Sequence, residues 1–255
     1  MQPLSIDVAQ YGTVEGISEN IRSALSLGLQ ELQFAPAKHD GTFVICGSGP
    51  SIESQIENIR ADKEAGKTIC AVKGAYDYLR SKGITPDLYL SVEPRYRPVK
   101  NPSKESSFLL ASRCHPEVFK ELSGYCIYLW HSWSIDDESE LIKDKTCIGG
   151  GTTSGLRAVN VGFILGYRKF VMYGMDSCLG ERGEKRVDEP TLGKGVEKTD
   201  VVVGGRRFIC NMAMAAQAQD FQHIYTVMPS VTIDVRGGGL LAAIVEERKA
   251  RGMHA

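Results

Sequence analysis

Residues 43–54 read "FVICGSGPSIES" and set four apolar residues before a glycine-rich turn and a helix-forming run. A buried strand that leads through a glycine turn into a helix is the repeating unit of parallel α/β sheets. Strand-like apolar runs recur at 42–46, 68–72, 87–92, 107–111, 125–130 and 169–173. Helical patterns cover 14–33, 51–65, 74–82, 152–166, 210–221 and 238–250. The alternation predicts an α/β fold: a Rossmann-like, mostly parallel sheet with helices on both faces.

Composition narrows the class of protein. The 255 residues carry 30 basic and 31 acidic side chains, so no overall field attracts nucleic acid or anionic lipid. No apolar run reaches the roughly 20 residues of a membrane span, and the first residues lack a signal-peptide pattern. Seven scattered cysteines without a C-x-x-C pair predict reduced thiols in a cytoplasm, with no disulfide framework or zinc site. We expect a cytoplasmic protein with no membrane span and no nucleic-acid partner.

The chain divides into two predicted parts. Residues 1–40 are expected to form a flanking helix and loop, and residues 41–255 the Rossmann-like domain, which the resemblance given below makes a nucleotide-binding transferase domain. Within that domain, 178–200 is a long loop rich in glycine and charge, of the kind that closes over a ligand. The next residues, "VVVGGRRFI", predict a small hairpin.

The first glycine turn, "GSGPS" at 47–51, has the parts of an anion site. Glycines let the backbone approach a ligand, and Pro50 suits the first helical position. The turn lacks the lysine of a phosphate-binding ATPase loop, and Ile52 stands where a dinucleotide fingerprint needs a third glycine. This excludes a standard ATPase and disfavours an NAD enzyme. The alternative is that the glycines serve only the geometry of the turn.

A second glycine turn strengthens the case for a ligand. "CIGGGTTSG" at 147–155 places three glycines and three hydroxyl side chains before an apolar helix. Two such helix starts in one sheet can hold two parts of one anionic ligand, such as a nucleotide. The predicted nucleotide-binding residues are Gly47, Ser48, Gly49, Pro50, Ser51, Gly151, Thr152, Thr153, Ser154 and Gly155. In the alternative, this turn too is only a tight connection.

Candidate catalytic residues stand where predicted strands end. Glu93 ends "DLYLSVE", Asp176 ends "KFVMYGMD", and His131 lies in "YLWHSWS". A carboxylate whose pKa is raised by burial can act as a base, and histidine suits acid–base work. The alternatives are a helix cap or turn former for each acid and a packed side chain for His131. We expect no metal site, since no ligand cluster has a recognisable spacing.

Several motifs in order resemble a known family. "VICGSGPSIE", "DLYLSVEP", "GGGTTSGLRAVNVGFILGYRKFVMYGMDS" and "GRRFICNMAMAAQAQDF" resemble the MptE-like proteins, which include the bacterial motility accessory factors. These resemble in turn bacterial sialyltransferases that use a nucleotide-activated sugar. The resemblance implies nucleotide contacts at both glycine turns and a role for Asp176. Three features depart from it. Ser48 stands where the sialyltransferases usually have Asn, and the segment after Asp176 lacks the histidine that they place there. At the end of the strand where the archaeal members have paired aspartates, this chain has only Glu93.

These observations leave three hypotheses. The first is a glycosyltransferase that uses a nucleotide-sugar donor and a small-molecule or glycan acceptor. The second is a pyrophosphokinase that moves diphosphate from ATP to a pterin alcohol, and only this activity requires Mg²⁺. The third is a nucleotide-binding or scaffold protein without chemistry. No tightly bound cofactor is expected, and the oligomeric state stays open.

Overall fold

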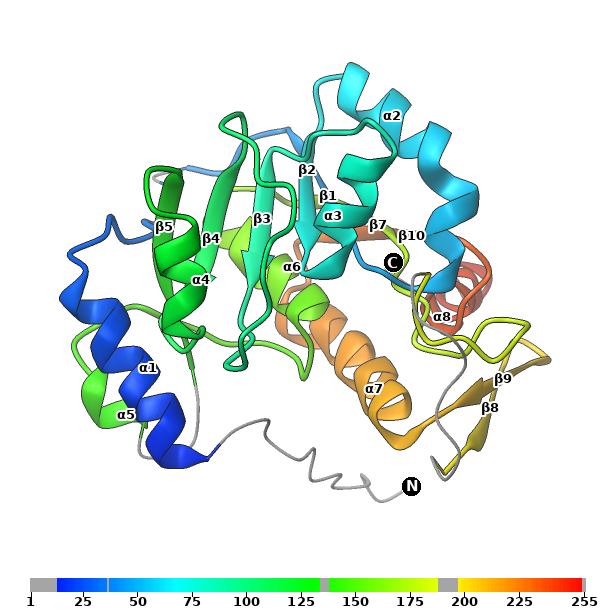
Figure 1. Ribbon diagram of the computed structural model, residues 1–255. Helices are drawn as coiled ribbons and strands as arrows, with labels where there is room; N and C mark the ends of the chain where they lie inside the picture. The colour runs from blue at the N-terminus through cyan, green and yellow to red at the C-terminus, as the bar shows by residue number, and fades with distance from the viewer. Residues whose placement is uncertain (1–12, 36, 134–137, 188–196, 254–255) are drawn as a thin grey trace.

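The computed structural model describes residues 13–35, 37–133, 138–187 and 197–253. Its main feature is an eight-stranded parallel sheet with a separate antiparallel hairpin (Figure 1). The sheet strands are β1 (Thr42–Cys46), β2 (Thr68–Val72), β3 (Leu88–Ser91), β4 (Ser107–Ala111), β5 (Cys126–Ser132), β6 (Cys147–Ile148), β7 (Lys169–Tyr173) and β10 (Thr232–Arg236). The hairpin consists of β8 (Thr199–Val203) and β9 (Arg206–Cys210).

Helices connect most of these strands. They are α1 (Val14–Ser26), a 3-10 helix η1 (Pro50–Gln55), α2 (Ile56–Glu64), α3 (Gly74–Ser81), α4 (Pro116–Glu121), α5 (Glu138–Leu141), α6 (Ser154–Ile164), α7 (Met212–Val227) and α8 (Leu240–Ala250). None of the described helices is long and apolar enough to cross a lipid bilayer.

The strand order is β10-β7-β1-β2-β3-β4-β5-β6, and β1 lies inside the sheet between β2 and β7. The last four residues of β1, Phe43–Cys46, are completely buried. A strand covered on both faces must be apolar throughout, because neither of its faces meets water. The predicted α/β fold class is therefore confirmed.

The chain reverses direction across the sheet after β6. From β1 to β6 each strand adds on the same side, and then α6 carries the chain back past β1 to β7. Because such crossovers are right-handed, α2, α3 and α4 lie on one face and α6 and α7 on the other. The reversal makes a switch point between β1 and β7, at whose carboxyl edge such sheets bind ligands.

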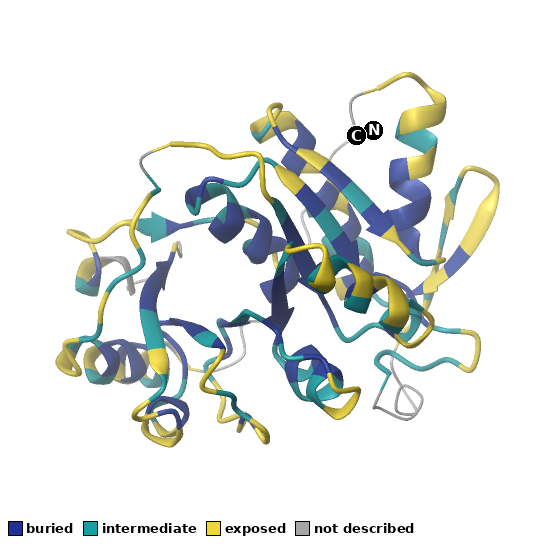
Figure 2. Cartoon of the chain, turned by 90° about the horizontal axis from the view of Figure 1, so that it is seen from above, coloured by how far each residue is buried: buried dark blue, intermediate teal, exposed yellow. Residues whose placement is uncertain are grey.

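The helices shield the sheet from water. Figure 2 shows buried strands at the centre and helices whose outer surfaces are exposed. Packing is close at Gly162 of α6, where an added Cβ would lie 2.7 Å from the ring of Phe170 and 3.0 Å from that of Phe43. A larger residue there would push α6 away from β1 and β7.

The N-terminal segment joins the far edge of the sheet. Ile17 and Ile21 of α1 pack with Ile142 in a small cluster of their own. After α1 the chain runs beside β5, where Leu32 N donates to Leu129 O at 2.7 Å. The predicted division at residue 40 remains a prediction.

Six elements differ from the sequence prediction. The helix expected at 51–65 begins with the 3-10 turn η1, and the one expected at 14–33 ends at Ser26. The two-residue β6 and the edge strand β10 were not expected, and neither were α4 and α5. The hairpin predicted at 201–209 is confirmed by β8 and β9. Of the long loop at 178–200, residues 188–196 lie outside the described residues.

Candidate functional site

A cleft of about 830 Å³ opens at the carboxyl ends of the strands. Its walls come from the residues that follow β1, β2, β3, β4, β5 and β7 and from the starts of α6 and α7. The cleft thus lies at the switch point where the sheet topology predicts a ligand. Both glycine turns contribute to it, through Gly47–Gly49 and through Gly150–Gly155.

The backbone of the first glycine turn is bonded to the end of β7. Gly47 N donates to Tyr173 O at 2.8 Å, and Gly49 N donates to Gly174 O at 2.8 Å. These two N–H groups are therefore engaged inside the protein. The ligand-facing part of the turn is centred on Ser48, which lines the cleft.

The glycines of this turn are required by a close approach of two chain segments. An added Cβ at Gly47 would lie 2.6 Å from Gly174 O, and one at Gly49 would lie 2.3 Å from Asp176 Oδ2. Real Cβ atoms do not approach so closely, and the obstacles are backbone and a buried carboxylate. Glycine therefore serves the geometry of the turn here, and the nucleotide contacts expected at Gly47 and Gly49 stay a prediction.

Asp176 fastens the start of η1. Its Oδ2 accepts a hydrogen bond from Ser51 N at 3.0 Å, so the carboxylate takes the place that a phosphate would need. The loop after β10 closes over it, with Leu240 N donating to Asp176 O at 2.8 Å. Burial raises the pKa of Asp176, against the lowering effect of its bonds to Ser51.

The second glycine turn is built differently. Gly150 and Gly151 have φ of 101° and 67°, a left-handed backbone that favours glycine. Thr153 then caps α6: its Oγ1 accepts from Leu156 N at 3.4 Å and from Gln217 Nε2 at 3.0 Å. The turn is thus held by side chains from α6 and α7.

The start of α6 opens into the cleft. Residues 150–155 all line the cleft, and the first N–H groups of a helix have no partner within the helix. Ser154 Oγ is buried here with no hydrogen-bond partner among the described residues. A backbone start with unused donors and a buried hydroxyl is suited to an anionic oxygen.

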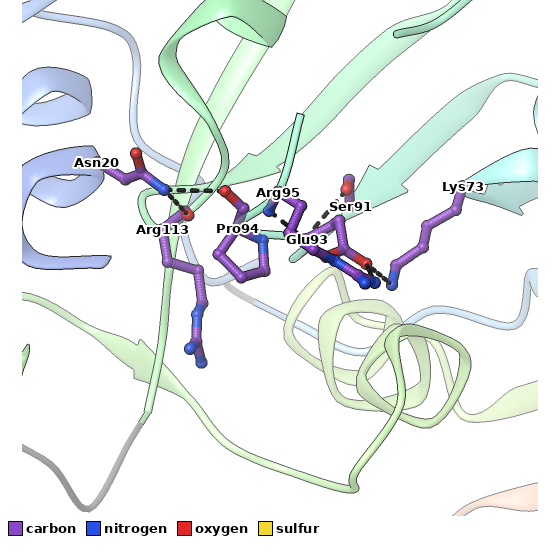
Figure 3. A network of polar contacts seen from close by, with 7 residues as sticks. All are labelled: Asn20, Lys73, Ser91, Glu93, Pro94, Arg95 and Arg113. Carbon is purple, nitrogen blue, oxygen red and sulfur yellow. Dashed lines mark hydrogen bonds and ion pairs between the residues drawn. The ribbon is translucent and has the colours of Figure 1, made fainter. Parts of the chain in front are cut away.

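Glu93 lies under two cationic side chains at the end of β3 (Figure 3). Its carboxylate is 5% exposed and contacts Lys73 Nζ at 2.9 Å and Arg95 Nε at 2.7 Å. Burial alone would raise the pKa of Glu93, but the hydrogen bond from Arg95 and the charge of Lys73 outweigh it and lower the pKa to about 2. The condition for Glu93 to act as a base, a pKa raised by burial, is therefore not met, because its neighbours stabilise the charged form. Its catalytic role stays a prediction.

Lys73 is a cleft residue that the sequence prediction missed. It follows β2 with φ 51° and ψ −124°, an uncommon conformation for a residue with a side chain. Such backbone is found preferentially at functional sites, where the surroundings hold it in place.

The side chain of Asn20, on α1, bridges by hydrogen bonds two loops that carry cationic residues. Its Nδ2 donates to Pro94 O and to Arg113 O, each at 3.1 Å (Figure 3). The side chain of Arg113 extends away from Asn20 in this view, and Arg113 lines the cleft. The flanking helix thus fixes the loops after β3 and β4, a role that sequence reasoning did not assign.

The cleft is electropositive. Among the described residues that line it, six are basic and three are acidic. The basic residues are Lys73, Arg95, Arg113, Arg157, Lys185 and Arg186. Positive charge focused in a cleft attracts anionic ligands even when the whole protein is close to neutral.

The described part of the long loop reaches the cleft. Val187 N donates to Ser48 O at 2.9 Å, which fixes this part of the loop against the first glycine turn. Lys185 and Arg186 line the cleft beside it. The expectation that the loop covers the ligand rests in part on residues 188–196, which lie outside the described residues.

His131 lies apart from the residues that line the cleft. It is 2% exposed on β5, with Nε2 3.7 Å from Glu31 Oε1. Burial lowers the pKa of His131, against the raising effect of Glu31. This position matches the alternative of a packed histidine.

The structure brings most of the predicted site together. Glu93, Asp176 and the two glycine turns line one cleft, except that Pro50 and Ser51 are not among the lining residues. Residues that the sequence prediction missed, besides the cations other than Arg95, are Asn211, Gln217 and Asp220. Asp220 Oδ2 accepts from Thr152 N at 2.8 Å. Within the described chain, no three His, Cys, Asp or Glu side chains gather in a way that could hold a metal ion.

Comparison with known proteins gives a family. The model of the family described as 6-hydroxymethylpterin diphosphokinase MptE-like matches residues 16–182, more than half of the chain. The resemblance read from the motifs is thereby confirmed. An uncharacterized protein of Treponema pallidum is 38% identical over 53 residues, which are 21% of this chain and 25% of that protein.

Solved structures support the fold. The MAf glycosyltransferase of Magnetospirillum magneticum AMB-1 matches 96% of this chain with a TM-score of 0.65 at 14% identity. This chain spans 43% of that protein's length. The sialyltransferase CstII of Campylobacter jejuni, solved in complex with a substrate analogue, cytidine-5'-monophosphate, matches 81% of this chain and 84% of its own with 12% identity. Its TM-score of 0.36 is too low to support an argument.

Proposed function

The chain belongs to the MptE-like family, and from its cleft we propose that it is a nucleotide-dependent transferase that moves a glycosyl group from a nucleotide-activated sugar. The observation that carries the proposal is the cleft itself, where the open start of α6 meets six basic side chains at the switch point of the sheet. Backbone donors and cations together suit phosphate oxygens.

The donor phosphate binds at the second glycine turn. N–H groups of the first turn of α6 and the Ser154 hydroxyl face the phosphate oxygens, and Arg157, one helical turn on, lines the same wall. Ser48 contacts the ligand from the opposite turn. The nucleotide thus spans the gap between β1 and the start of α6.

Transfer breaks the bond between the sugar and the phosphate oxygen, so negative charge grows on the departing nucleotide. Fixed donors and cations that face this oxygen stabilise the transition state more than the ground state. Of the two candidate carboxylates, only Asp176 has a raised pKa, which suits proton transfer from the acceptor better than the low pKa of Glu93.

Thermal melting with CMP, CDP, UDP, GDP, AMP and ATP, each with and without Mg²⁺, tests the binding step. A ligand of the folded state raises the melting temperature, and we expect a shift with the donor's nucleotide. Sugar nucleotides of the same base are then tested for slow hydrolysis without acceptor. Absence of any shift would remove the proposal.

Variants assign the chemistry. Asp176→Asn is expected to reduce donor hydrolysis while nucleotide still binds. His131→Ala serves as the matched control, because that side chain lies outside the cleft lining. Equal hydrolysis by Asp176→Asn and the control would remove Asp176 as the proton acceptor.

A second candidate is the diphosphokinase for which the family is described. It predicts AMP release from ATP when 6-hydroxymethylpterin and Mg²⁺ are present. Product analysis separates the two, since glycosyl transfer leaves ATP intact.

A nucleotide-binding protein without chemistry is the third candidate. It is favoured by the engagement of all three lining carboxylates in hydrogen bonds or ion pairs with the protein. Turnover distinguishes it: nucleotide binding without donor hydrolysis, transfer or AMP release would select it.

A further inference from the structure

The loops after β2 and β3 place two cations on one buried carboxylate. Glu93 Oε2 contacts Lys73 Nζ at 2.9 Å and Arg95 Nη2 at 3.2 Å, and Glu93 Oε1 contacts Arg95 Nε at 2.7 Å. The carboxylate is 5% exposed, while the side chains of Lys73 and Arg95 are 34% and 44% exposed. The group therefore presents cations to the cleft and hides its anion.

We propose that Lys73 and Arg95, seated on Glu93, form a cationic subsite that holds a second anionic group of the ligand without a divalent cation. The inference rests on the proposed function, since it takes the first anionic group to be the donor phosphate at α6. The second group is the β-phosphate of a nucleoside diphosphate or the carboxylate of an acidic sugar.

The carboxylates of the cleft do not fit a magnesium ion. Diphosphate chemistry commonly uses Mg²⁺, which requires oxygen ligands, in proteins mostly carboxylates. In the described lining, Glu93 is engaged by two cations, Asp176 accepts from Ser51 N, and Asp220 accepts from Thr152 N. Two positive side chains within 3 Å of Glu93 would also repel a second positive ion there.

The same two cations can do what the metal would do. Both neutralise the charge of an oxyanion and donate hydrogen bonds to it, Lys73 as a point charge and Arg95 as a planar fork. The net charge of the three side chains is positive, which favours an anion over a cation in the adjoining part of the cleft. Glu93 acts as the positioning residue that orients both cations toward the cleft.

The placement suits one extended ligand. β2 is the direct neighbour of β1, and β3 is the neighbour of β2. Strands lie about 4.8 Å apart, so Lys73 stands about one strand spacing from the end of β1. The uncommon backbone of Lys73, with φ 51°, holds the side chain at this edge.

The test measures binding of inorganic diphosphate by calorimetry, in excess EDTA and in excess Mg²⁺. Proteins compared are wild type, Lys73→Met, Lys73→Arg and the control Lys120→Met, whose lysine side chain is 77% exposed on α4 and outside the cleft lining. Thermal melts without ligand accompany each protein. The affinity for nucleoside diphosphates is then compared with that for monophosphates, which tests the β-phosphate as the second anion. The affinity for monophosphates is also measured with and without glucuronate, which tests the carboxylate of an acidic sugar.

We expect wild type to bind diphosphate at least as tightly in EDTA as in Mg²⁺. Lys73→Met should weaken binding about tenfold or more, as expected for loss of a hydrogen bond to a charged group. Lys73→Arg should retain most of the affinity, and Lys120→Met all of it. If Lys73→Met does not fold, the diphosphate affinity of Lys73→Arg and the comparison of EDTA with Mg²⁺ still test the inference.

Two results would overturn the inference: binding at least about tenfold tighter with Mg²⁺, or equal affinity of folded Lys73→Met and Lys120→Met. Neither of these results contradicts the proposed function, provided that nucleotides still raise the melting temperature. Conversely, diphosphate binding that depends on Lys73 without any response to nucleotides would leave the subsite standing and remove the nucleotide donor.

Discussion

The two glycine turns look alike in sequence and differ in structure. Each follows a strand and precedes a helix, and each carries glycine beside serine or threonine. In the first turn, N–H groups donate to β7 and to the residues that follow it, up to Asp176. In the second, side chains from α6 and α7 hold the turn and the helix start faces the cleft.

The comparison shows why glycine is required at particular positions of such a turn. At Gly49 the neighbour that excludes a side chain is a buried carboxylate that follows β7, whereas at Gly151 it is Leu156 of α6. At Gly149 no atom lies within 4 Å of an added Cβ, so packing does not require the glycine there. Glycine therefore marks close approach at some positions of such a turn and not at others. Only the fold shows which positions those are.

The largest effect is expected from Gly49→Ala. Its Cβ would lie 2.3 Å from Asp176 Oδ2 and 2.6 Å from Gly174 O, neither of which can move freely. We expect a loss of about 3 kcal/mol in the free energy of unfolding, as overpacking of a rigid site costs. Denaturant unfolding measures it, with Gly149→Ala as the control within about 0.5 kcal/mol of wild type.

The opposite ranking would break the comparison. A stable Gly49→Ala together with a destabilised Gly149→Ala would mean that the first turn has room for a side chain. The tight contact with β7 would then not be the reason for its glycines.

Local patterns were enough to predict the central strands. The strands at 42–46 and 68–72 coincide with β1 and β2, because a strand buried on both faces is an unbroken apolar run. β10 was missed because it lies at the edge and alternates apolar with polar residues in only five positions. β6 has only two residues, too few for any periodicity.

The candidate site was predictable in part. Residues next to the glycine turns could be proposed because the carboxyl ends of parallel strands share one edge. Lys73, Arg113 and Asp220 could not, since their meeting depends on how distant segments pack. The pKa of Glu93 shows the same limit: burial was foreseeable, but the two cations that reverse its effect were not.

A smaller effect is expected from Asp176→Ala. The variant leaves Ser51 N without its acceptor in a partly buried place, which costs about 2 kcal/mol of the free energy of unfolding. Asp176→Asn keeps an oxygen that accepts this hydrogen bond and should lose less. Equal losses for both variants would mean that the bond to Ser51 does not stabilise the turn.

The pH dependence of Asp176→Asn sharpens this test. The folded-state pKa of Asp176 is raised above 3.8, so its stabilising contribution is present at low pH and is lost as pH rises through the folded-state pKa. Asparagine does not titrate, so the melting temperature of Asp176→Asn should gain on that of wild type as pH rises from 3.8 through the folded-state pKa of Asp176. A difference in melting temperature that is constant with pH would contradict the buried, raised carboxyl.

The smallest effect on stability, and the most specific to the second turn, is expected from Thr153→Val. The change keeps the shape of the side chain and removes the oxygen that accepts from Leu156 N and Gln217 Nε2. Loss of such a cap costs about 1 kcal/mol in denaturant unfolding. Thr152→Val is the matched control, because Thr152 contacts Asp220 through its backbone N–H.

If α6 binds the donor phosphate, Thr153→Val should also weaken nucleotide binding measured by calorimetry, since a frayed start no longer fixes the N–H groups of Ser154 and Gly155. Loss of stability with unchanged nucleotide affinity would move the phosphate away from this turn and make the two glycine turns equivalent.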